Sequence, residues 1–219
     1  MPELVSFDLD EGIATLTMDD GKANALSLPM SQALDAALDR AAREARVVVI
    51  RGRPGVLSGG FDLKVIRGGD VAQNAAMEHA GMRLLSRLYA LPQPLIIACT
   101  GHAVAGGAMM LLTGDVRIGV RGAFRIGLNE VGIGLALGQT GVELALARLL
   151  PTAVTAAVVL ARLYGPDDAA RIGYLDIAVE SEGFDSTVAE KARELLAIDL
   201  KAFATTKRRL RQPTLDRMD

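Results

Sequence analysis

The sequence is poor in the side chains that most often carry metal, redox or nucleic-acid chemistry. Its 219 residues include one cysteine, two histidines and no tryptophan, and only 4% are aromatic. A lone cysteine excludes a disulfide within the chain and a cysteine-rich zinc site. The net charge of −2 and the few stacking rings argue against nucleic-acid binding, which needs a basic surface. We therefore expect neither a metal site nor a nucleic-acid partner.

Charged side chains are missing from one long stretch, residues 88–114. The stretch is long enough to cross a bilayer, but its prolines and glycines would break a spanning helix. We expect a buried strand, a glycine-rich turn and a buried helix there, and no membrane contact. The N-terminus carries early acidic residues and no long apolar segment, so it does not resemble a secretory signal. A cytoplasmic protein is expected.

Glycine, in contrast, is abundant, with 23 of the 219 residues. Two stretches place glycines between a buried apolar run and the start of a helix: VVVIRGRPGVLSGGFDLKVI and LIIACTGHAVAGGAMMLL. Neither contains the G-x-G-x-x-G or G-x-x-x-x-G-K-[ST] pattern, which disfavours a nucleotide-binding regulator. Such glycines either permit close packing of helix on sheet or expose backbone N–H groups that stabilise negative charge. Two N–H groups converging on one oxygen would form an oxyanion hole.

Apolar periodicity predicts the order of helices and strands. Residues 3–7 and 12–18 indicate a hairpin, and 29–44 places apolar residues on one helical face after Ser27, a candidate N-cap. The apolar runs 47–50 and 95–99 are typical of strands buried on both faces. The other expected elements are helices at about 74–90 and after Gly106-Gly107, a strand at 116–120, helices at 139–149, 152–162, 167–172 and 185–211, and a strand at 176–179.

This alternation predicts an α/β fold with a mostly parallel sheet. Residues 1–138 would form the core, and residues 139–219 a C-terminal helical region that makes one structural unit with it. The basic end KRRLRQPTLDR is expected to be a solvated helix end, with a phosphate contact as the alternative.

Three segments resemble the signature segments of the crotonase superfamily, the enoyl-CoA hydratases and isomerases: LSGGFDLK (57–64), ACTGHAVAGGAMMLLTGDVRIG (98–119) and FRIGLNEVGIGL (124–135). GKANAL (21–26) and AARIGYLDIAV (169–179) extend the likeness over nearly the whole chain. The resemblance implies a spiral of ββα units with a C-terminal helical layer, an acyl-CoA thioester substrate, and a homotrimer or a dimer of trimers. Coenzyme A would be part of the substrate, with no separately bound cofactor.

The resemblance also implies the parts of the site. The thioester carbonyl would lie between the backbone N–H groups of Gly59 and Gly106, and Glu130 of the motif GLNE would move the proton. Lys22 would meet a CoA phosphate or stay solvated, and Asp62 would cap the following helix or border the pocket. The residues expected to contact the substrate are Lys22, Ala23, Ala25, Ser58, Gly60, Phe61, Asp62, Leu63, Ala105, Gly107 and Met109.

The type of reaction depends on the number of carboxylates. A hydratase needs two, one to position water and one to exchange the proton, whereas an isomerase that shifts a double bond from C3 to C2 can use one. In the family's hydratases the first glutamate lies three residues after the second oxyanion glycine, and here that position is Met109. The sequence therefore resembles the single-glutamate Δ3,Δ2-enoyl-CoA isomerases, with Glu130 as the base.

Two other functions stay open at this point. One is a hydratase with an unusual second acid, for which Glu143 on the next helix is a candidate. The other is a non-catalytic CoA-binding protein of the same fold, because a thioether such as that of Met109 cannot carry a proton. We expect structural roles for Asp115 between a helix and a strand, for His102 in a turn, and for Cys99 as a small apolar residue.

Overall fold

The chain begins with a tight hairpin. The structure, a computed structural model, describes residues 3–218. Strands β1 (Val5–Asp10) and β2 (Ile13–Met18) pair antiparallel, which confirms the predicted hairpin. Between them Glu11 and Gly12 have positive φ angles of 46° and 84°. Two such residues suit the type I′ turn, whose twist matches that of the flanking strands.

The strands form two sheets. The larger has the order β1-β2-β3-β5-β7-β9 and is parallel from β2 onward, and the smaller has the parallel order β4-β6-β8. The strands of the larger sheet after the hairpin are β3 (Val47–Arg51), β5 (Leu95–Cys99), β7 (Val116–Val120) and β9 (Ile177–Val179). Those of the smaller sheet are β4 (Gly55–Ser58), β6 (Gly101–Val104) and β8 (Ile126–Gly127).

The two sheets arise from a repeated unit of strand, strand and helix. β3 is followed by β4, β5 by β6 and β7 by β8, and a helix follows each pair, so the chain climbs as a spiral of ββα units. The alternation of apolar runs predicted the first strand of each pair and one mostly parallel sheet. It missed the second strands, which are short and glycine-containing. Only the family resemblance implied the spiral.

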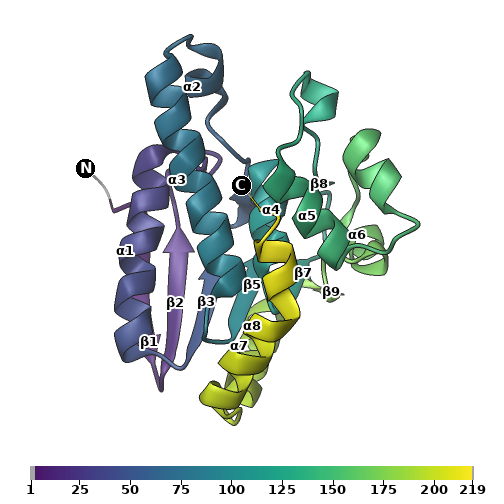
Figure 1. Cartoon of the computed structure of the whole chain (residues 1–219). Helices are drawn as coiled ribbons and strands as arrows, with labels where there is room; N and C mark the ends of the chain where they lie inside the picture. Colours follow the sequence, from purple (N-terminus) through teal and green to yellow (C-terminus); the bar gives the residue numbers. More distant parts are fainter. Residues whose placement is uncertain (1–2, 219) are drawn as a thin grey trace.

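The central strands β3 and β5 of the larger sheet are buried on both faces, as their continuous apolar runs predicted. Val48 and Ile50 pack on one side in a cluster with helices α1 (Leu28–Glu44), α3 (Val71–Ala90) and α4 (Gly106–Thr113). Val47 and Val49 face the other side, where α7 (Ser181–Leu196) covers the sheet. Figure 1 shows α1 and α3 side by side across the first face. Burial on both faces makes this sheet a rigid platform for the loops at its edge.

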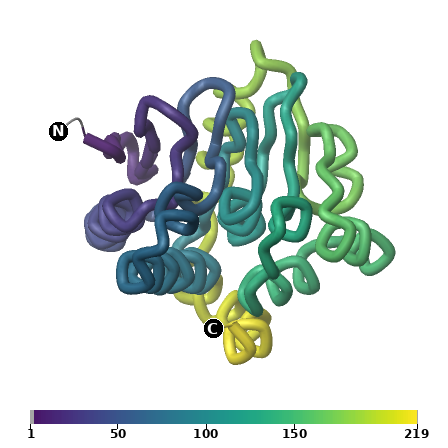
Figure 2. Tube along the Cα trace, turned by 90° about the horizontal axis from the view of Figure 1, so that it is seen from above, coloured from purple at the N-terminus to yellow at the C-terminus, as the bar shows by residue number. Residues whose placement is uncertain are grey.

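The predicted helix over 185–211 is wrong: two helices occupy that region. α7 ends at Leu196, and α8 (Leu200–Leu215) begins after Asp199, whose carboxylate accepts a hydrogen bond from the Ala202 N–H at 2.7 Å. The chain turns there because α7 packs on the sheet while α8 packs against α3 and α5 (Gln139–Arg148). Figure 2 shows α8, in yellow, between those two helices.

The other helical elements are short. The expected helix over 152–162 is reduced to one π turn, η2 (Thr155–Val159), and Ala161 after it has a φ of 51°. The remaining elements are α2 (Leu63–Arg67), η1 (Val131–Ile133) and α6 (Pro166–Ile172). No helix within residues 3–218 is both long and apolar enough to span a bilayer.

A buried ion cluster fastens α8 to the core. Lys207 Nζ lies 2.6 Å and Arg211 Nη2 lies 2.8 Å from the two carboxylate oxygens of Asp115. Asp115 also accepts a hydrogen bond from the Leu95 N–H at 2.8 Å. The predicted structural role of Asp115 is therefore confirmed, and the basic C-terminal segment is partly buried rather than fully solvated.

Candidate active site

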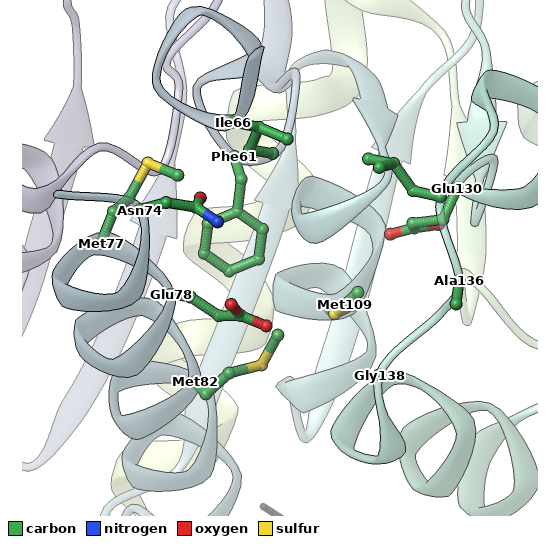
Figure 3. A pocket seen from close by; sticks show the side chains of 11 residues that line it. Phe61, Ile66, Asn74, Met77, Glu78, Met82, Met109, Glu130, Ala136 and Gly138 are labelled. Carbon is green, nitrogen blue, oxygen red and sulfur yellow. The ribbon is translucent and has the colours of Figure 1, made fainter. Parts of the chain in front are cut away.

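One pocket gathers residues from the predicted helix 74–90 and from the three signature segments 57–64, 98–119 and 124–135. It has a volume of about 190 Å³. The residues that line it are Phe61, Ile66, Asn74, Met77, Glu78, Met82, Met109, Glu130, Leu135, Ala136 and Gly138. Figure 3 shows Phe61 and the α3 side chains on one wall, with Met109 and then Glu130 across from them. The wall is mainly apolar, which suits the acyl part of a ligand.

Glu130 is the buried carboxylate of this pocket. The residue is 8% exposed, and neither carboxylate oxygen has a hydrogen-bond partner within residues 3–218. Burial raises the pKa of Glu130 to about 7, while its own backbone N–H favours the charged form more weakly. A carboxyl group with such a pKa accepts and releases protons near neutral pH, as a general base must.

The segment that carries Glu130 is held by backbone contacts. The Glu130 carbonyl accepts hydrogen bonds from the N–H groups of Ile133 and Leu135 at 3.0 and 2.9 Å. Upstream, the Leu128 N–H donates to the hydroxyl of Tyr174 at 3.2 Å, and Tyr174 is fully buried. Tyr174 thereby fixes the start of the loop on which Glu130 lies.

The two glycine-rich segments meet beside the pocket. A Cβ atom added at Gly60 would lie 2.9 Å from the backbone nitrogen of Gly106, and one at Gly107 would lie 2.2 Å from the carbonyl oxygen of Ser58. Gly60 also has a φ of 86°. Glycine is required at 60 and 107 because any side chain there would push the segments apart.

The available N–H groups differ from the predicted pair at one position. The Gly59 N–H donates to the Ala23 carbonyl at 2.7 Å, so Gly59 is not free to bind an oxyanion and its assignment is corrected. The Gly60 N–H donates to Ser58 Oγ at 3.1 Å. Phe61 is the next residue, and no hydrogen bond between described residues uses its N–H. The Gly106 N–H is likewise unused within residues 3–218, as expected in the first turn of a helix.

The match to a family model covers residues 8–218, and that family is the enoyl-CoA hydratases and isomerases. The chain belongs to the enoyl-CoA hydratase/isomerase family. It is 30% identical to human "Enoyl-CoA delta isomerase 1, mitochondrial" over 98% of this chain and 72% of that protein. It is 28% identical to a "Probable enoyl-CoA hydratase" of Bacillus subtilis over 88% of this chain and 74% of the relative.

Solved structures of the enoyl-CoA hydratase/isomerase family have the same fold. A family protein from Pseudomonas syringae is 42% identical, with a TM-score of 0.94 over 97% of this chain and 92% of that one. The human mitochondrial Δ3,Δ2-enoyl-CoA isomerase is 30% identical, with a TM-score of 0.94 over 98% and 85% of the two chains. The crotonase-type spiral is thus confirmed. Because the relatives are enzymes, the protein is an enzyme of this family and not a non-catalytic binder.

Most of the predicted contact residues of the enoyl-CoA hydratase/isomerase site do not line the pocket, and some of them support its loops instead. Ser58 is buried, and its hydroxyl donates to the Asn24 carbonyl at 2.7 Å. Asp62 caps α2 by accepting from the Lys64 N–H at 2.9 Å, which confirms the capping role. Of the residues predicted for the site, Phe61, Met109 and Glu130 line the pocket.

The turn at 21–26 lies against the first glycine-rich segment. The side-chain amide of Asn24 donates to the carbonyls of Met18 and Leu57 at 3.0 and 3.2 Å, and Leu26 N–H donates to the Gly60 carbonyl at 2.8 Å. Lys22 and Ala23 are exposed, while Ala25 and Leu63 lie at the edge of the same region. Asn24, which the sequence analysis missed, is therefore the residue that anchors this turn.

Glu143 does not line the pocket. Its Oε2 lies 2.8 Å from Arg217 Nε, and its Oε1 accepts a hydrogen bond from the Gln139 amide at 3.0 Å. Glu143 is 4% exposed and ties α5 to the C-terminal end of the chain. The Glu143 carboxylate is thus paired with Arg217 and Gln139 and does not face a substrate in the pocket.

His102 and Cys99 have structural surroundings, as predicted. His102 Nδ1 accepts a hydrogen bond from the Arg125 N–H at 3.0 Å. Cys99 is buried, its thiol donates to the Gly101 carbonyl at 3.2 Å, and burial raises the pKa of the thiol to about 12. A thiol that stays protonated is not a nucleophile.

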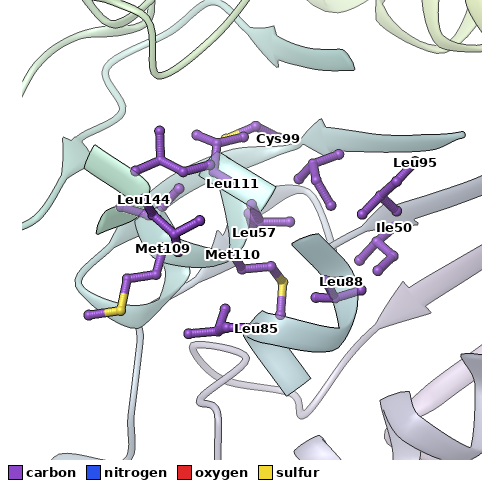
Figure 4. Close-up of a cluster of buried hydrophobic side chains, with 14 of the residues drawn as sticks. Ile50, Leu57, Leu85, Leu88, Leu95, Cys99, Met109, Met110, Leu111 and Leu144 are labelled. Carbon is purple, nitrogen blue, oxygen red and sulfur yellow. The ribbon is translucent and has the colours of Figure 1, made fainter. Parts of the chain in front are cut away.

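Met109 belongs both to the core and to the pocket wall. Figure 4 shows Met109, Met110 and Leu111 in the same buried cluster as Leu57 and Leu85, with the Met109 side chain at its edge. Met109 is 2% exposed and lines the pocket. An apolar side chain therefore fills the position where the resemblance places the first hydratase glutamate.

Ala105 adopts a strained backbone conformation just before Gly106, whose N–H group is unpaired within the described residues. Its φ of 51° and ψ of −128° are unfavourable for a residue with a side chain. Its own N–H donates to the Gly127 carbonyl at 3.0 Å, which helps to hold it in this conformation. The strain fixes the peptide unit that carries the Gly106 N–H.

We expect Ala105→Gly to raise the free energy of unfolding by about 1 kcal/mol, because glycine adopts this conformation without strain. Urea unfolding checks the change, and turnover should stay close to that of the wild type. Ala36→Gly, at an exposed position within α1, is the control and should lower stability by about 1 kcal/mol. Equal losses in the two variants would contradict the strain at Ala105.

Proposed function

We propose that this enzyme shifts the double bond of a 3-enoyl-CoA to C2, with Glu130 as the proton carrier. The observation that carries the proposal is Met109 on the pocket wall. It stands where the family's hydratases have the first of their two glutamates. Glu130 supplies one buried carboxylate, which suffices to take a proton from C2 and return it at C4. The relatives named isomerase and hydratase are about equally similar to this chain, so this choice rests on the site.

The reaction forms a dienolate, which is then protonated at C4. The Glu130 carboxylate takes the C2 proton, and the electrons of the C–H bond move into the thioester, leaving negative charge on its oxygen. We assign the N–H groups of Phe61 and Gly106 as the donors to that oxygen, because both are unused within residues 3–218. The protonated Glu130 then delivers its proton to C4, and the double bond lies between C2 and C3.

No separately bound cofactor enters this scheme. Coenzyme A arrives as part of the substrate, and we propose that its phosphates approach the exposed turn that carries Lys22 and Ala23. That turn adjoins the oxyanion donors, because Ala23 accepts the Gly59 N–H at 2.7 Å. A ligand on the turn could therefore reach the donors with its thioester.

The proposal is tested by assaying the purified enzyme with 3-hexenoyl-CoA and with crotonyl-CoA. Isomerisation should be fast, and hydration of crotonyl-CoA slow or absent. Fast hydration with no isomerisation would overturn the proposal. It would show that the enzyme is a hydratase whose second acid lies at a position other than 109.

We expect Met109→Glu to raise the rate of crotonyl-CoA hydration by about 10–100-fold, because it adds a second carboxylate to the pocket. The hydration rate of Met109→Glu should stay below that of a natural two-glutamate hydratase, because the new carboxyl group is buried and lacks hydrogen-bond partners. Met109→Gln, which has a similar shape and no proton to transfer, is the control and should leave hydration unchanged. An equal gain in both variants would contradict a role for the carboxylate.

A further inference from the structure

One wall of the pocket carries two polar side chains among apolar ones. Asn74, Met77, Glu78 and Met82 all belong to α3, and their spacing places them on one helical face. Figure 3 shows the Asn74 amide and the Glu78 carboxylate beside Phe61, on the side of the pocket opposite Glu130. Apart from Glu130, the other residues that line the pocket are Phe, Ile, Met, Leu, Ala and Gly, so Asn74 and Glu78 are the polar side chains at the end away from Glu130.

Both polar side chains are available to a ligand. Within residues 3–218, neither the Asn74 amide nor the Glu78 carboxylate has a side-chain hydrogen bond or an ion pair. The arginines of the same helix, in contrast, are paired: Arg83 and Arg87 lie 3.2 and 2.9 Å from the carboxylate of Asp35. Asn74 is half-buried, and Glu78 is exposed at the rim.

A plain hydrocarbon chain fits this wall poorly. It would displace water from the half-buried Asn74 amide without replacing its hydrogen bonds, which is unfavourable, whereas the exposed Glu78 carboxylate keeps its water. A hydroxyl group fits both side chains, because it donates one hydrogen bond and accepts others. Glu78 can only accept, and the Asn74 amide nitrogen can donate.

We propose that the acyl group of the preferred substrate carries a hydroxyl group beyond C4, which donates to Glu78 and accepts from Asn74. This rests on the proposed function, in that the acyl-CoA occupies the pocket of Glu130. An ammonium group could also pair with Glu78, but it could not accept the hydrogen bond that the Asn74 N–H offers. A charged group would also lose water among Phe61, Ile66 and Met82.

The experiment measures binding without turnover. The affinity of 6-hydroxyhexanoyl-CoA is compared with that of hexanoyl-CoA by calorimetry, in the wild type and in Glu78→Leu. The wild type should bind the hydroxylated probe about ten-fold more tightly, as a hydrogen bond to a charged group allows. Glu78→Leu should lose this preference. Gln73→Leu, at an exposed position of α3 outside the pocket, is the control and should keep it.

Four results would overturn the hydroxyl assignment: equal affinities in the wild type, a preference that Glu78→Leu leaves unchanged, tighter binding of 6-aminohexanoyl-CoA, or loss of crotonyl-CoA hydration in Glu78→Gln. The last would make Glu78 the second acid of a hydratase. Failure of the isomerase proposal looks different, because it appears as absent turnover of 3-hexenoyl-CoA and leaves the binding preference intact.

Discussion

Glu130→Gln is expected to lower kcat for 3-enoyl-CoA isomerisation by about 10²–10⁴-fold, the range for loss of a positioned general base. Glutamine has nearly the same shape but takes no proton from C2. Because the Phe61 and Gly106 N–H groups stay in place, KM should change much less than kcat. Turnover of 3-hexenoyl-CoA measures the loss, and hexanoyl-CoA binding serves as the control for an intact pocket. Near-normal turnover would remove Glu130 from the role of base.

The raised pKa of Glu130 also predicts a pH profile. The base must be deprotonated before it can act, so kcat/KM of the wild type should rise with pH through about 7 and then level off. The residual activity of Glu130→Gln should lack this step. A wild-type profile that is flat between pH 5 and 9 would contradict a base with this pKa.

The same ionisation has a cost in stability. Burial raises the folded-state pKa of Glu130 from 4.5 to about 7, so the folded protein binds this proton more tightly than the unfolded chain does. The corresponding stability is fully present below pH 4.5 and is lost as pH rises through about 7. At pH 8, Glu130→Gln should therefore be more stable than the wild type by on the order of 2–3 kcal/mol. The gain should shrink as the pH falls.

Gly107→Ala is expected to damage both folding and catalysis. The new Cβ atom would lie 2.2 Å from the Ser58 carbonyl oxygen, which is backbone and cannot rotate away. Overpacking of this kind costs about 1–3 kcal/mol, and the contact is tight enough for the upper end. Ser58 immediately precedes the segment 59–61, so relief of the clash moves the Phe61 N–H away from the Gly106 N–H. We expect kcat to fall by about 10²–10³-fold, as when one oxyanion donor is lost.

Urea unfolding and 3-enoyl-CoA turnover measure these two effects of Gly107→Ala. Gly183→Ala is the matched control, because no atom lies within 4 Å of the added Cβ and the position is in α7. It should raise stability by up to about 1 kcal/mol through better helix propensity. A Gly107→Ala variant with wild-type stability and turnover would show that the two glycine-rich segments need not touch.

Local patterns along the sequence predicted much of this site. The polar–apolar order located the hairpin, the first strand of each ββα unit and most of the helices. The motif likeness pointed to Glu130 and Met109, and the structure places both on one pocket wall. The likeness did not reveal that Gly59 is engaged by Ala23, since a hydrogen bond between positions distant along the chain leaves no local signal.

The contributions of Asn74 and Glu78 were missed for a related reason. Their spacing on a helix was readable, but nothing in the sequence showed that this face of α3 meets Met109 and Glu130 across a cavity. The same holds for Glu143, whose partner Arg217 comes from the far end of the chain. Likewise, the prediction of a single C-terminal helix was wrong because α7 packs on the sheet, whereas α8 packs against α3 and α5.

The sequence by itself contained the glycine-rich segments, the carboxylate of GLNE and Met109, and its likeness to the family implied what these residues do. Residue identities and short spacings of this kind are visible without the fold. Only the tertiary structure decided which N–H groups stay free, which carboxylates are already paired, and which side chains share the pocket. Those outcomes depend on contacts between segments far apart along the chain, and the close packing at Gly60 and Gly107 brings these segments together.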